Sequence, residues 1–170
     1  ARFDPATNSW SPISTVGQPA PRASATSVWT GQEIIFWGAG PGDPFTPDSG
    51  GRYNPATDSW KPVSQKNAPL VTYGHSAVWT GSEMITFGGI SSNEGAKRYS
   101  PAANKWTNAT LVNDPGHRDH HGAVWTGSEM VVWGGSIDSG QIGPRGGRYN
   151  PVTNTWVQIN ASAGQPEARM

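Results

Sequence analysis

The sequence predicts an all-β fold made of a four-stranded unit that repeats along the chain, and two recurring motifs are the basis for this prediction. The motif Arg-(Tyr/Phe)-x-Pro-x-x-x-x-Trp occurs four times, at residues 2–10, 52–60, 98–106 and 148–156. A second motif, Val-Trp-Thr-Gly-x-Glu followed by an apolar run, begins at Val28, Val78 and Val124. Successive copies of the first motif start 50, 46 and 50 residues apart. A fixed period of this length indicates one supersecondary unit that is repeated.

Composition agrees with short strands joined by turns and limits the classes of function. The 22 Gly and 15 Pro among 170 residues argue against long helices. A net charge of zero with only 14% charged residues argues against binding nucleic acid by bulk electrostatics. The chain has no Cys, so disulfides, thiolate metal sites and Cys nucleophiles are excluded. Its apolar runs are too short to cross a bilayer, so we expect no membrane insertion.

The middle copy of the repeat shows how one unit is built. Its four expected strands lie within residues 75–80, 83–87, 96–100 and 104–108. Gly81 stands in a tight turn between the first two, where glycine can adopt a positive φ without steric cost. Pro101 ends the third strand because it cannot donate to a ladder. The unit is therefore expected to be a four-stranded antiparallel meander.

The second strand of each unit is apolar on both faces, as in IIFW at 34–37 and MVVW at 130–133. A strand with one face in water would alternate instead, so each sheet must be covered on both sides. Neighbouring copies are the natural covers, and sheets stacked radially in this way form a β-propeller. We expect half a blade at 1–12, complete blades at 22–62, 72–108 and 118–159, and a lead into a next blade at 160–170.

The repeat resembles the kelch repeat, and in particular a bacterial type of kelch array. The resemblance rests on a Gly-Gly doublet after the second strand, a Tyr in the third and a Trp in the fourth. These residues are Gly88, Gly89, Tyr99 and Trp106 in one unit and Gly134, Gly135, Tyr149 and Trp156 in the next. The first complete unit departs from the pattern, with Gly38-Ala39-Gly40 in place of the doublet. The resemblance implies that the first strand of each blade lines a central channel and the fourth lies outermost.

The expected ring is incomplete. Propellers close with roughly four to eight blades, and this chain supplies about three and a half. The remaining blades would come from the same longer chain or from a partner chain. The chain by itself would leave two apolar sheet faces open to water, and exposed patches of that kind drive association.

The resemblance also implies that loops from strand two to three share one face with loops from strand four to the next strand one. We call this the loop face. Loops on a rigid scaffold carry function. Two inter-strand loops are long, 40–50 and 136–146, and the His-rich loop 114–121 is expected on the same face. The candidate binding residues in them are Asp43, Phe45, Asp48, His117, Asp119, His120, Asp138 and Arg145.

Three of the four His lie within 117–121, which raises the alternative of a metal site using His117, His120 and Asp114. Adjacent His120 and His121 would point to opposite sides of a strand, which weakens that alternative. We therefore expect no metal and no cofactor. His121 aligns with His75 at the start of an inner strand, and both are expected to be structural.

Residues repeated at fixed positions are expected to serve packing rather than catalysis. One Arg and one Glu recur in each blade and suggest a structural ion pair; these residues are Arg52, Arg98, Arg148, Glu33, Glu83 and Glu129. All nine Trp fit the repeat, so blade packing explains them without a carbohydrate-stacking platform.

These observations favour a non-enzymatic interaction module that binds a protein or glycan through the loop face, as part of a larger exported or envelope-associated protein. We accordingly favour an extracellular or cell-envelope location. The alternative is part of a kelch-propeller enzyme, carbohydrate-acting or oxidase-like, whose catalytic residues lie outside this segment. The copper radical site of the oxidase type needs a Cys, so it cannot lie in this chain.

Overall fold

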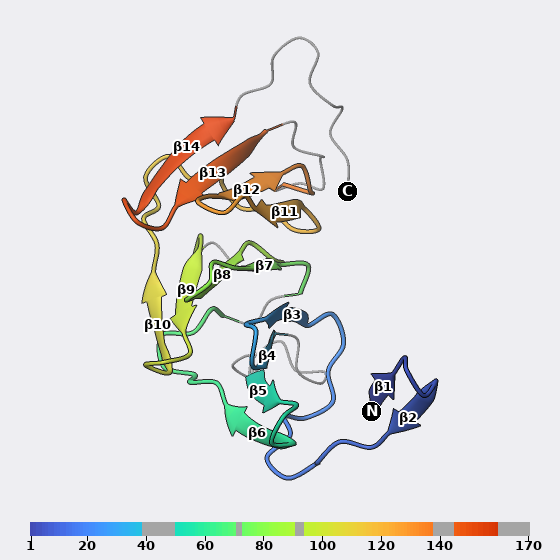
Figure 1. Cartoon of the computed structure of the whole chain (residues 1–170). Helices are drawn as coiled ribbons and strands as arrows, with labels where there is room; N and C mark the ends of the chain where they lie inside the picture. Colours follow the sequence, from blue (N-terminus) through green and yellow to red (C-terminus); the bar gives the residue numbers. More distant parts are fainter. Residues whose placement is uncertain (39–49, 71–72, 91–93, 138–144, 160–170) are drawn as a thin grey trace.

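The computed structural model describes residues 1–38, 50–70, 73–90, 94–137 and 145–159. Within these residues the chain forms fourteen strands and no helix, so none that could span a membrane (Figure 1). All pairings between named strands are antiparallel. The predicted all-β class is therefore confirmed.

Three sheets have four strands each, joined in sequence order as meanders. The first contains β3 (Thr26–Trp29), β4 (Ile34–Trp37), β5 (Gly50–Asn54) and β6 (Ser59–Pro62). The second contains β7 (Ser76–Trp79), β8 (Met84–Phe87), β9 (Lys97–Ser100) and β10 (Lys105–Asn108). The third contains β11 (Gly122–Trp125), β12 (Met130–Trp133), β13 (Gly146–Asn150) and β14 (Thr155–Ile159). We call them blades 1, 2 and 3.

A two-stranded sheet precedes blade 1 and consists of β1 (Arg2–Asp4) and β2 (Ser9–Ser11). The blades follow one another along an arc, and the first strands β3, β7 and β11 contact each other along its inner side (Figure 1). The sheets do not close into a ring, so the architecture is an incomplete propeller. The incomplete ring expected from the sequence is confirmed.

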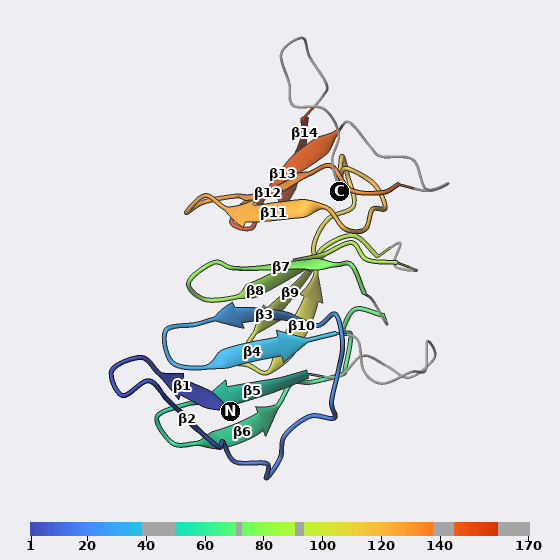
Figure 2. The same cartoon turned by 90° about the vertical axis from the view of Figure 1, so that its right-hand side faces the viewer.

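The two ends of the blades differ in the connections that they carry (Figure 2). The short turns from strand one to two and from strand three to four lie at one end, which we call the turn face. The ends of the second strands, the starts of the third strands and the described parts of the connections between blades lie at the other end, which is the loop face. The first turn of each blade contains Gly31, Gly81 or Gly127, with φ of 94°, 99° and 101°. This confirms the positive φ predicted for Gly81.

Apolar side chains fill both blade interfaces. The interface between blades 1 and 2 contains Val28, Ile35, Trp37, Val63, Met84, Tyr99 and Trp106. The next interface contains Val78, Ile85, Phe87, Ala96, Ala109, Met130, Val132, Tyr149 and Trp156. Met84 and Ile85 are neighbours in β8 but face opposite interfaces, because successive side chains of a strand alternate. This is why the second strand is apolar on both faces.

The Arg-Tyr-x-Pro motif links consecutive blades through hydrogen bonds. The Tyr99 hydroxyl donates to Asn104 Oδ1 at 2.6 Å. The same oxygen accepts the N–H of Ser64, in the connection that follows blade 1, at 2.9 Å. The Trp106 indole N–H donates to the Ser64 carbonyl at 2.8 Å. Tyr53, Asp58, Trp60 and Ser14 make the same set of bonds one blade earlier.

Burial of the Trp side chains only partly follows the sequence prediction. Trp106 is fully buried, whereas Trp79 and Trp125 are half-buried at the turn face. Trp10 and Trp29 are 70% and 52% exposed, so blade packing does not account for all nine Trp. Trp79 packs against blade 1. Trp29 is exposed because, among the described residues, no corresponding inner hairpin lies against blade 1.

Candidate functional site

The loop face is best described around residues 117–120, which cross from blade 2 to blade 3. Arg118 fixes this segment: its side chain is 2% exposed and donates to four carbonyls. The acceptors are the carbonyl oxygens of Pro115, Gly116, Gly134 and Arg145. Burial lowers the pKa of Arg118, and the carbonyl acceptors compensate for the water that it loses. Arg22 donates to the Gly38 carbonyl at 2.9 Å in the corresponding place of blade 1.

The backbone of Asp119 pairs with the segment that follows β12. Asp119 and Ser136 exchange two N–H to carbonyl hydrogen bonds of 2.9 Å. Gly135 makes this close approach possible, because a Cβ there would collide with the Asp119 carbonyl oxygen. The Gly-Gly doublet of the sequence motif is thus the place where the incoming connection crosses the end of the second strand.

His120 is presented to solvent from this fixed segment. Its φ is 52°, a left-handed conformation that is uncommon for residues other than glycine. The backbone N–H donates to the Gly74 carbonyl at 2.8 Å, and the side chain is 55% exposed. Nδ1 lies 2.5 Å from Asp119 Oδ1, so the carboxylate holds the ring in one orientation. Ser24 and Gly74 occupy the equivalent positions of blades 1 and 2 and also have positive φ, 59° and 74°.

The residues of the metal alternative do not converge. His117 Nε2 lies 3.0 Å from the Gly89 carbonyl oxygen, whereas His120 is bonded to Asp119. Burial raises the pKa of Asp114, which makes its charged form more costly. Within the described residues no group of three or more His, Cys, Asp or Glu side chains is arranged to hold a metal ion.

Of the other loop candidates, Arg145 has an exposed side chain and a carbonyl that accepts from Arg118. Asp43, Phe45, Asp48 and Asp138 lie outside the described residues. Four of the eight candidates therefore lie within the described residues: His117, Asp119, His120 and Arg145.

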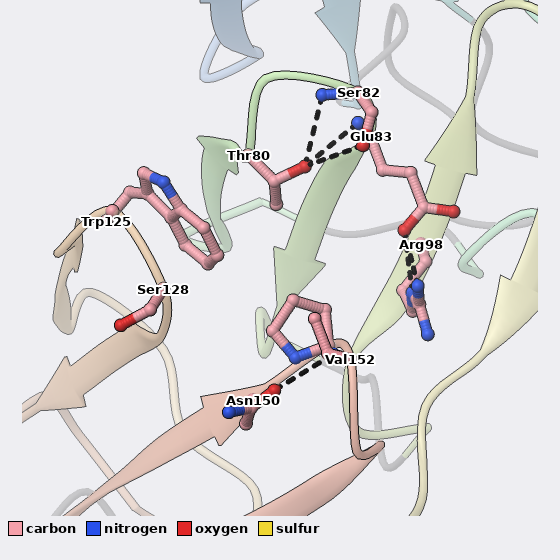
Figure 3. Close-up of a pocket in the computed structure, with 10 residues that line it drawn as sticks. Thr80, Ser82, Glu83, Arg98, Trp125, Ser128, Asn150 and Val152 are labelled. Carbon is pink, nitrogen blue, oxygen red and sulfur yellow. Dashed lines mark hydrogen bonds and ion pairs between the residues drawn. The ribbon is translucent and has the colours of Figure 1, made fainter.

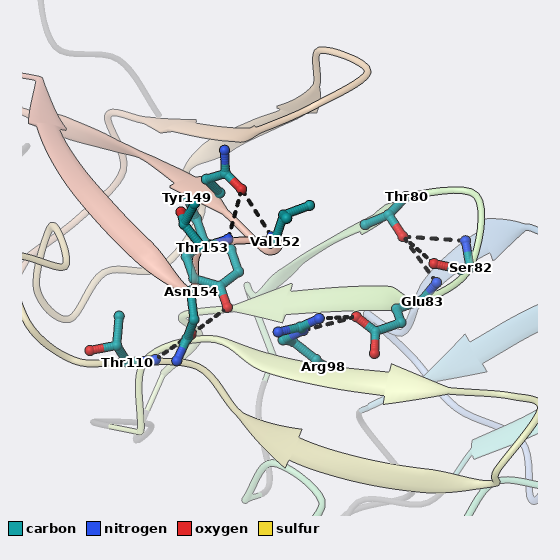
Figure 4. A network of polar contacts seen from close by, with 10 residues as sticks. Thr80, Ser82, Glu83, Arg98, Thr110, Tyr149, Val152, Thr153 and Asn154 are labelled. Carbon is teal, nitrogen blue, oxygen red and sulfur yellow. Dashed lines mark hydrogen bonds and ion pairs between the residues drawn. The ribbon is translucent and has the colours of Figure 1, made fainter.

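The repeated Arg and Glu side chains lie at the turn face. Arg98 makes two hydrogen bonds to Glu83 Oε2, of 2.6 and 2.8 Å (Figure 4). The other pairs are looser, with Arg52 Nε 3.7 Å from Glu33 and Arg148 Nη1 3.8 Å from Glu129. Arg52 Nη1 also donates to the Pro101 carbonyl of the next blade at 2.5 Å.

The two aligned His side chains bridge neighbouring inner strands. His75 Nε2 lies 2.8 Å from Thr26 Oγ1, and His121 Nε2 lies 2.7 Å from Ser76 Oγ. Burial, followed by the positive charges of Arg118 and His75, lowers the pKa of His121 to about 4. His121 is therefore neutral at physiological pH and serves as a polar link between blades.

The turn face also holds two grooves, one at each blade interface, which the sequence analysis did not anticipate. The groove between blades 2 and 3 has a volume of about 340 Å³ and includes Trp125, Glu83 and Arg98 in its lining (Figure 3). The groove between blades 1 and 2 has about 400 Å³, with Trp79, Glu33 and Arg52 at the corresponding places. Trp79 and Trp125 are only half-buried because one side of each ring faces a groove, and this partial exposure is what identifies the two grooves.

The family model of the KLHDC2/KLHL20/DRC7 Kelch-repeats domain matches residues 24–170. The match covers most of the chain and all three complete blades. The chain belongs to the kelch-repeat family. Blades 2 and 3 carry the doublet, the Tyr and the Trp of the motif, and blade 1 carries the Tyr and the Trp.

Kelch domains generally bind proteins, and the kelch propeller is typically a protein-interaction module. The comparison with curated proteins gives no match to this chain. The family thus establishes the scaffold and its general use, while the ligand has to be argued from the site.

Proposed function

We propose that this chain is a non-enzymatic interaction module that binds a protein partner through the loop face at blades 2 and 3. The observation that carries the proposal is the presentation of His120. The left-handed position recurs in every blade, filled by Ser24 in blade 1 and by Gly74 in blade 2, and it carries an imidazole only in blade 3. The ring is exposed and oriented by Asp119, on a segment that Arg118 fixes to four carbonyls.

The surroundings of His120 suit a protein surface. Tyr73 precedes Gly74, whose carbonyl accepts the His120 N–H, and it is 49% exposed. Leu70, earlier in the same connection, is 59% exposed. A combination of exposed aromatic and apolar side chains with polar groups held in place is typical of an interface core and its rim. Asp119, which contacts the ring, and the exposed side chain of Arg145 would set orientation more than affinity. The candidates Asp43, Phe45, Asp48 and Asp138 are proposed to extend the same surface.

A quantitative affinity-capture experiment tests this function. The 170-residue chain is used as bait in an extract of its source cells, beside the loop-face variant His120→Gly/Arg145→Ala and the turn-face variant Ser82→Ala. Glycine preserves the left-handed backbone at position 120, so the first variant removes side chains without forcing the loop to change. We expect at least one protein to be retained by the wild type and by Ser82→Ala but lost with the loop-face variant. Equal capture by all three baits would refute the proposal.

We also propose that further blades, from a longer chain or a partner chain, cover the open faces. Support comes from Trp10, Trp29 and Val124, which are 70%, 52% and 60% exposed. Light scattering of the 170-residue chain is expected to show association through these faces. A dispersed, cooperatively folding monomer would contradict this part of the proposal.

A further inference from the structure

The two grooves of the turn face repeat one arrangement of side chains. In the groove between blades 2 and 3, Trp125 forms one wall, and Glu83 and Arg98 lie across from it (Figure 3). The lining is completed by Thr80, Ser82, Gly127, Ser128, Asn150, Pro151 and Val152. Each groove is assembled from the first turn of one blade and the turns of the next, so it exists only where two blades meet.

The lining offers one aromatic surface together with groups that exchange hydrogen bonds. The side chains of Glu83 and Arg98 are each 23% exposed, so the ion pair keeps contact with solvent. Asn150 Oδ1 accepts the N–H groups of Val152 (Figure 3) and Thr153, which leaves its side-chain NH₂ as a donor. The Ser128 hydroxyl is a further donor and acceptor at the rim.

The charge of the lining argues against an ionic ligand. Glu83 and Arg98 are the charged residues of the first groove and form a pair, and Glu33 and Arg52 do the same in the second. A strongly anionic or cationic ligand would therefore gain little net attraction. A neutral ligand with many hydroxyl groups and one apolar face fits this lining best.

The volumes of about 340 and 400 Å³ lie at the lower end of the range for small-molecule sites, about 300–1,000 Å³. Grooves of this volume can hold a sugar ring. A pyranose presents an apolar C–H face to an aromatic wall, while its hydroxyls form hydrogen bonds with polar groups at the edge. Trp is suited to such contacts because its ring combines a large apolar surface with a polar N–H. β-linked glucose units match best, because all their ring substituents are equatorial and both faces expose only C–H bonds.

We propose that the grooves lined by Trp79 and Trp125 bind a neutral β-linked glycan, with sugar units of one polymer in successive grooves. Repetition of the same groove from blade to blade matches the repetition of units in a polysaccharide. Once one groove holds the polymer, the next sugar units are at a high effective concentration at the second groove. Two weak sites would therefore bind the polymer more tightly than either site alone. The proposal is independent of the loop-face function, because the turns that line the grooves lie at the opposite end of the blades (Figure 2).

Titration of the 170-residue chain with cellohexaose, a β-1,4-linked glucose oligomer, tests the proposal. Tryptophan fluorescence and calorimetry report binding, and thermal unfolding of each variant reports folding. We expect Trp125→Ala to weaken the affinity about tenfold, equivalent to about 1.4 kcal/mol, and Trp79→Ala to act in the same direction. Trp10→Ala is the matched control, because Trp10 is 70% exposed and lines neither groove.

A second variant protects the test against misfolding of Trp125→Ala. Ser128 is exposed at the groove rim, so Ser128→Trp is expected to fill the groove without disturbing the core and to weaken binding at least as much. An anionic oligogalacturonate of equal length is expected to bind more weakly than cellohexaose. No binding of cellohexaose by the wild type, or equal binding by wild type and Ser128→Trp, would overturn the proposal. Groove-dependent binding of an oligoproline peptide in place of cellohexaose would overturn it as well and identify a peptide site.

Discussion

Acidification should weaken the chain through His121. Its Nε2 is bonded to Ser76, and its buried Nδ1 has no hydrogen-bond partner among the described residues. The protonated ring carries an N–H on both nitrogens, so one donor would be left without an acceptor. Burial and the nearby positive charge of Arg118 add to this cost and lower the pKa of His121 from 6.5 to about 4.

The sign and size of the effect follow from linkage. As the pH falls below 6.5, the unfolded chain takes up a proton at residue 121 while the folded chain does not, so the free energy of unfolding decreases. At about pH 5 the loss from this one residue is about 2 kcal/mol relative to neutral pH. The loss stops growing near pH 4, where the folded state also takes up the proton. Most carboxylates titrate below about pH 5, so the interval above it reports mainly on histidines.

Urea unfolding of the wild type and of His121→Gln at neutral pH and at about pH 5 measures the contribution. Gln can still bond Ser76 but does not titrate in this interval. We expect the free energy of unfolding to decrease by about 2 kcal/mol more in the wild type than in the variant. The same pH dependence in both proteins would refute the assignment of a buried neutral His121.

Three further predictions concern stability at neutral pH. Gly81→Val should cost about 1–2 kcal/mol through backbone strain alone, because a Cβ there meets no atom within 4 Å; a loss below about 0.3 kcal/mol in urea unfolding would be inconsistent with φ of 99°. Trp106→Ala should cost about 3–5 kcal/mol, whereas Trp10→Ala should cost far less; similar midpoints for the two variants would contradict their assigned burial. His120→Gly should leave stability unchanged or raise it by up to about 1 kcal/mol, as measured by thermal unfolding beside Ser24→Gly. A marked loss in His120→Gly alone would show that the imidazole serves the fold.

Much of the fold could be predicted because the repeat is written into the sequence several times. Apolar runs on both faces of the second strand required neighbours on both sides, and the structure places Met84 and Ile85 in different interfaces. The turn glycines were predictable because a tight turn between two short strands requires a positive φ.

The sequence could not reveal how neighbouring blades are bonded to one another. Hydrogen bonds link Tyr99 to Asn104 and Asn104 to Ser64, which follows the preceding blade. The motif shows that the positions of Tyr99 and Asn104 recur, but it does not show that they bond a residue of another blade. The exposure of Trp29 was missed for a similar reason. Trp29 and Trp79 stand in the same motif, and each depends on the blade before its own for cover. Trp79 packs against blade 1, whereas the sheet before blade 1 contains only β1 and β2 among the described residues.

The candidate site was predicted in part. The cluster of histidines marked the segment around 117–121, but the three side chains have different roles that only geometry separates. His117 contacts the Gly89 carbonyl, His120 is exposed beside Asp119, and His121 is buried against Ser76. The grooves were missed because their walls come from turns about 45 residues apart, a distance over which sequence spacing carries no information about contact.

Hydrogen–deuterium exchange of the chain with a captured protein partner tests the central claim most directly. The account predicts slower exchange in the loop-face segments 73–74 and 117–120 when the partner is bound, with little change in the turns at 80–83 and 126–129. Slower exchange confined to those turns, or none in the loop-face segments, would contradict the claim that this kelch array binds protein through its loop face.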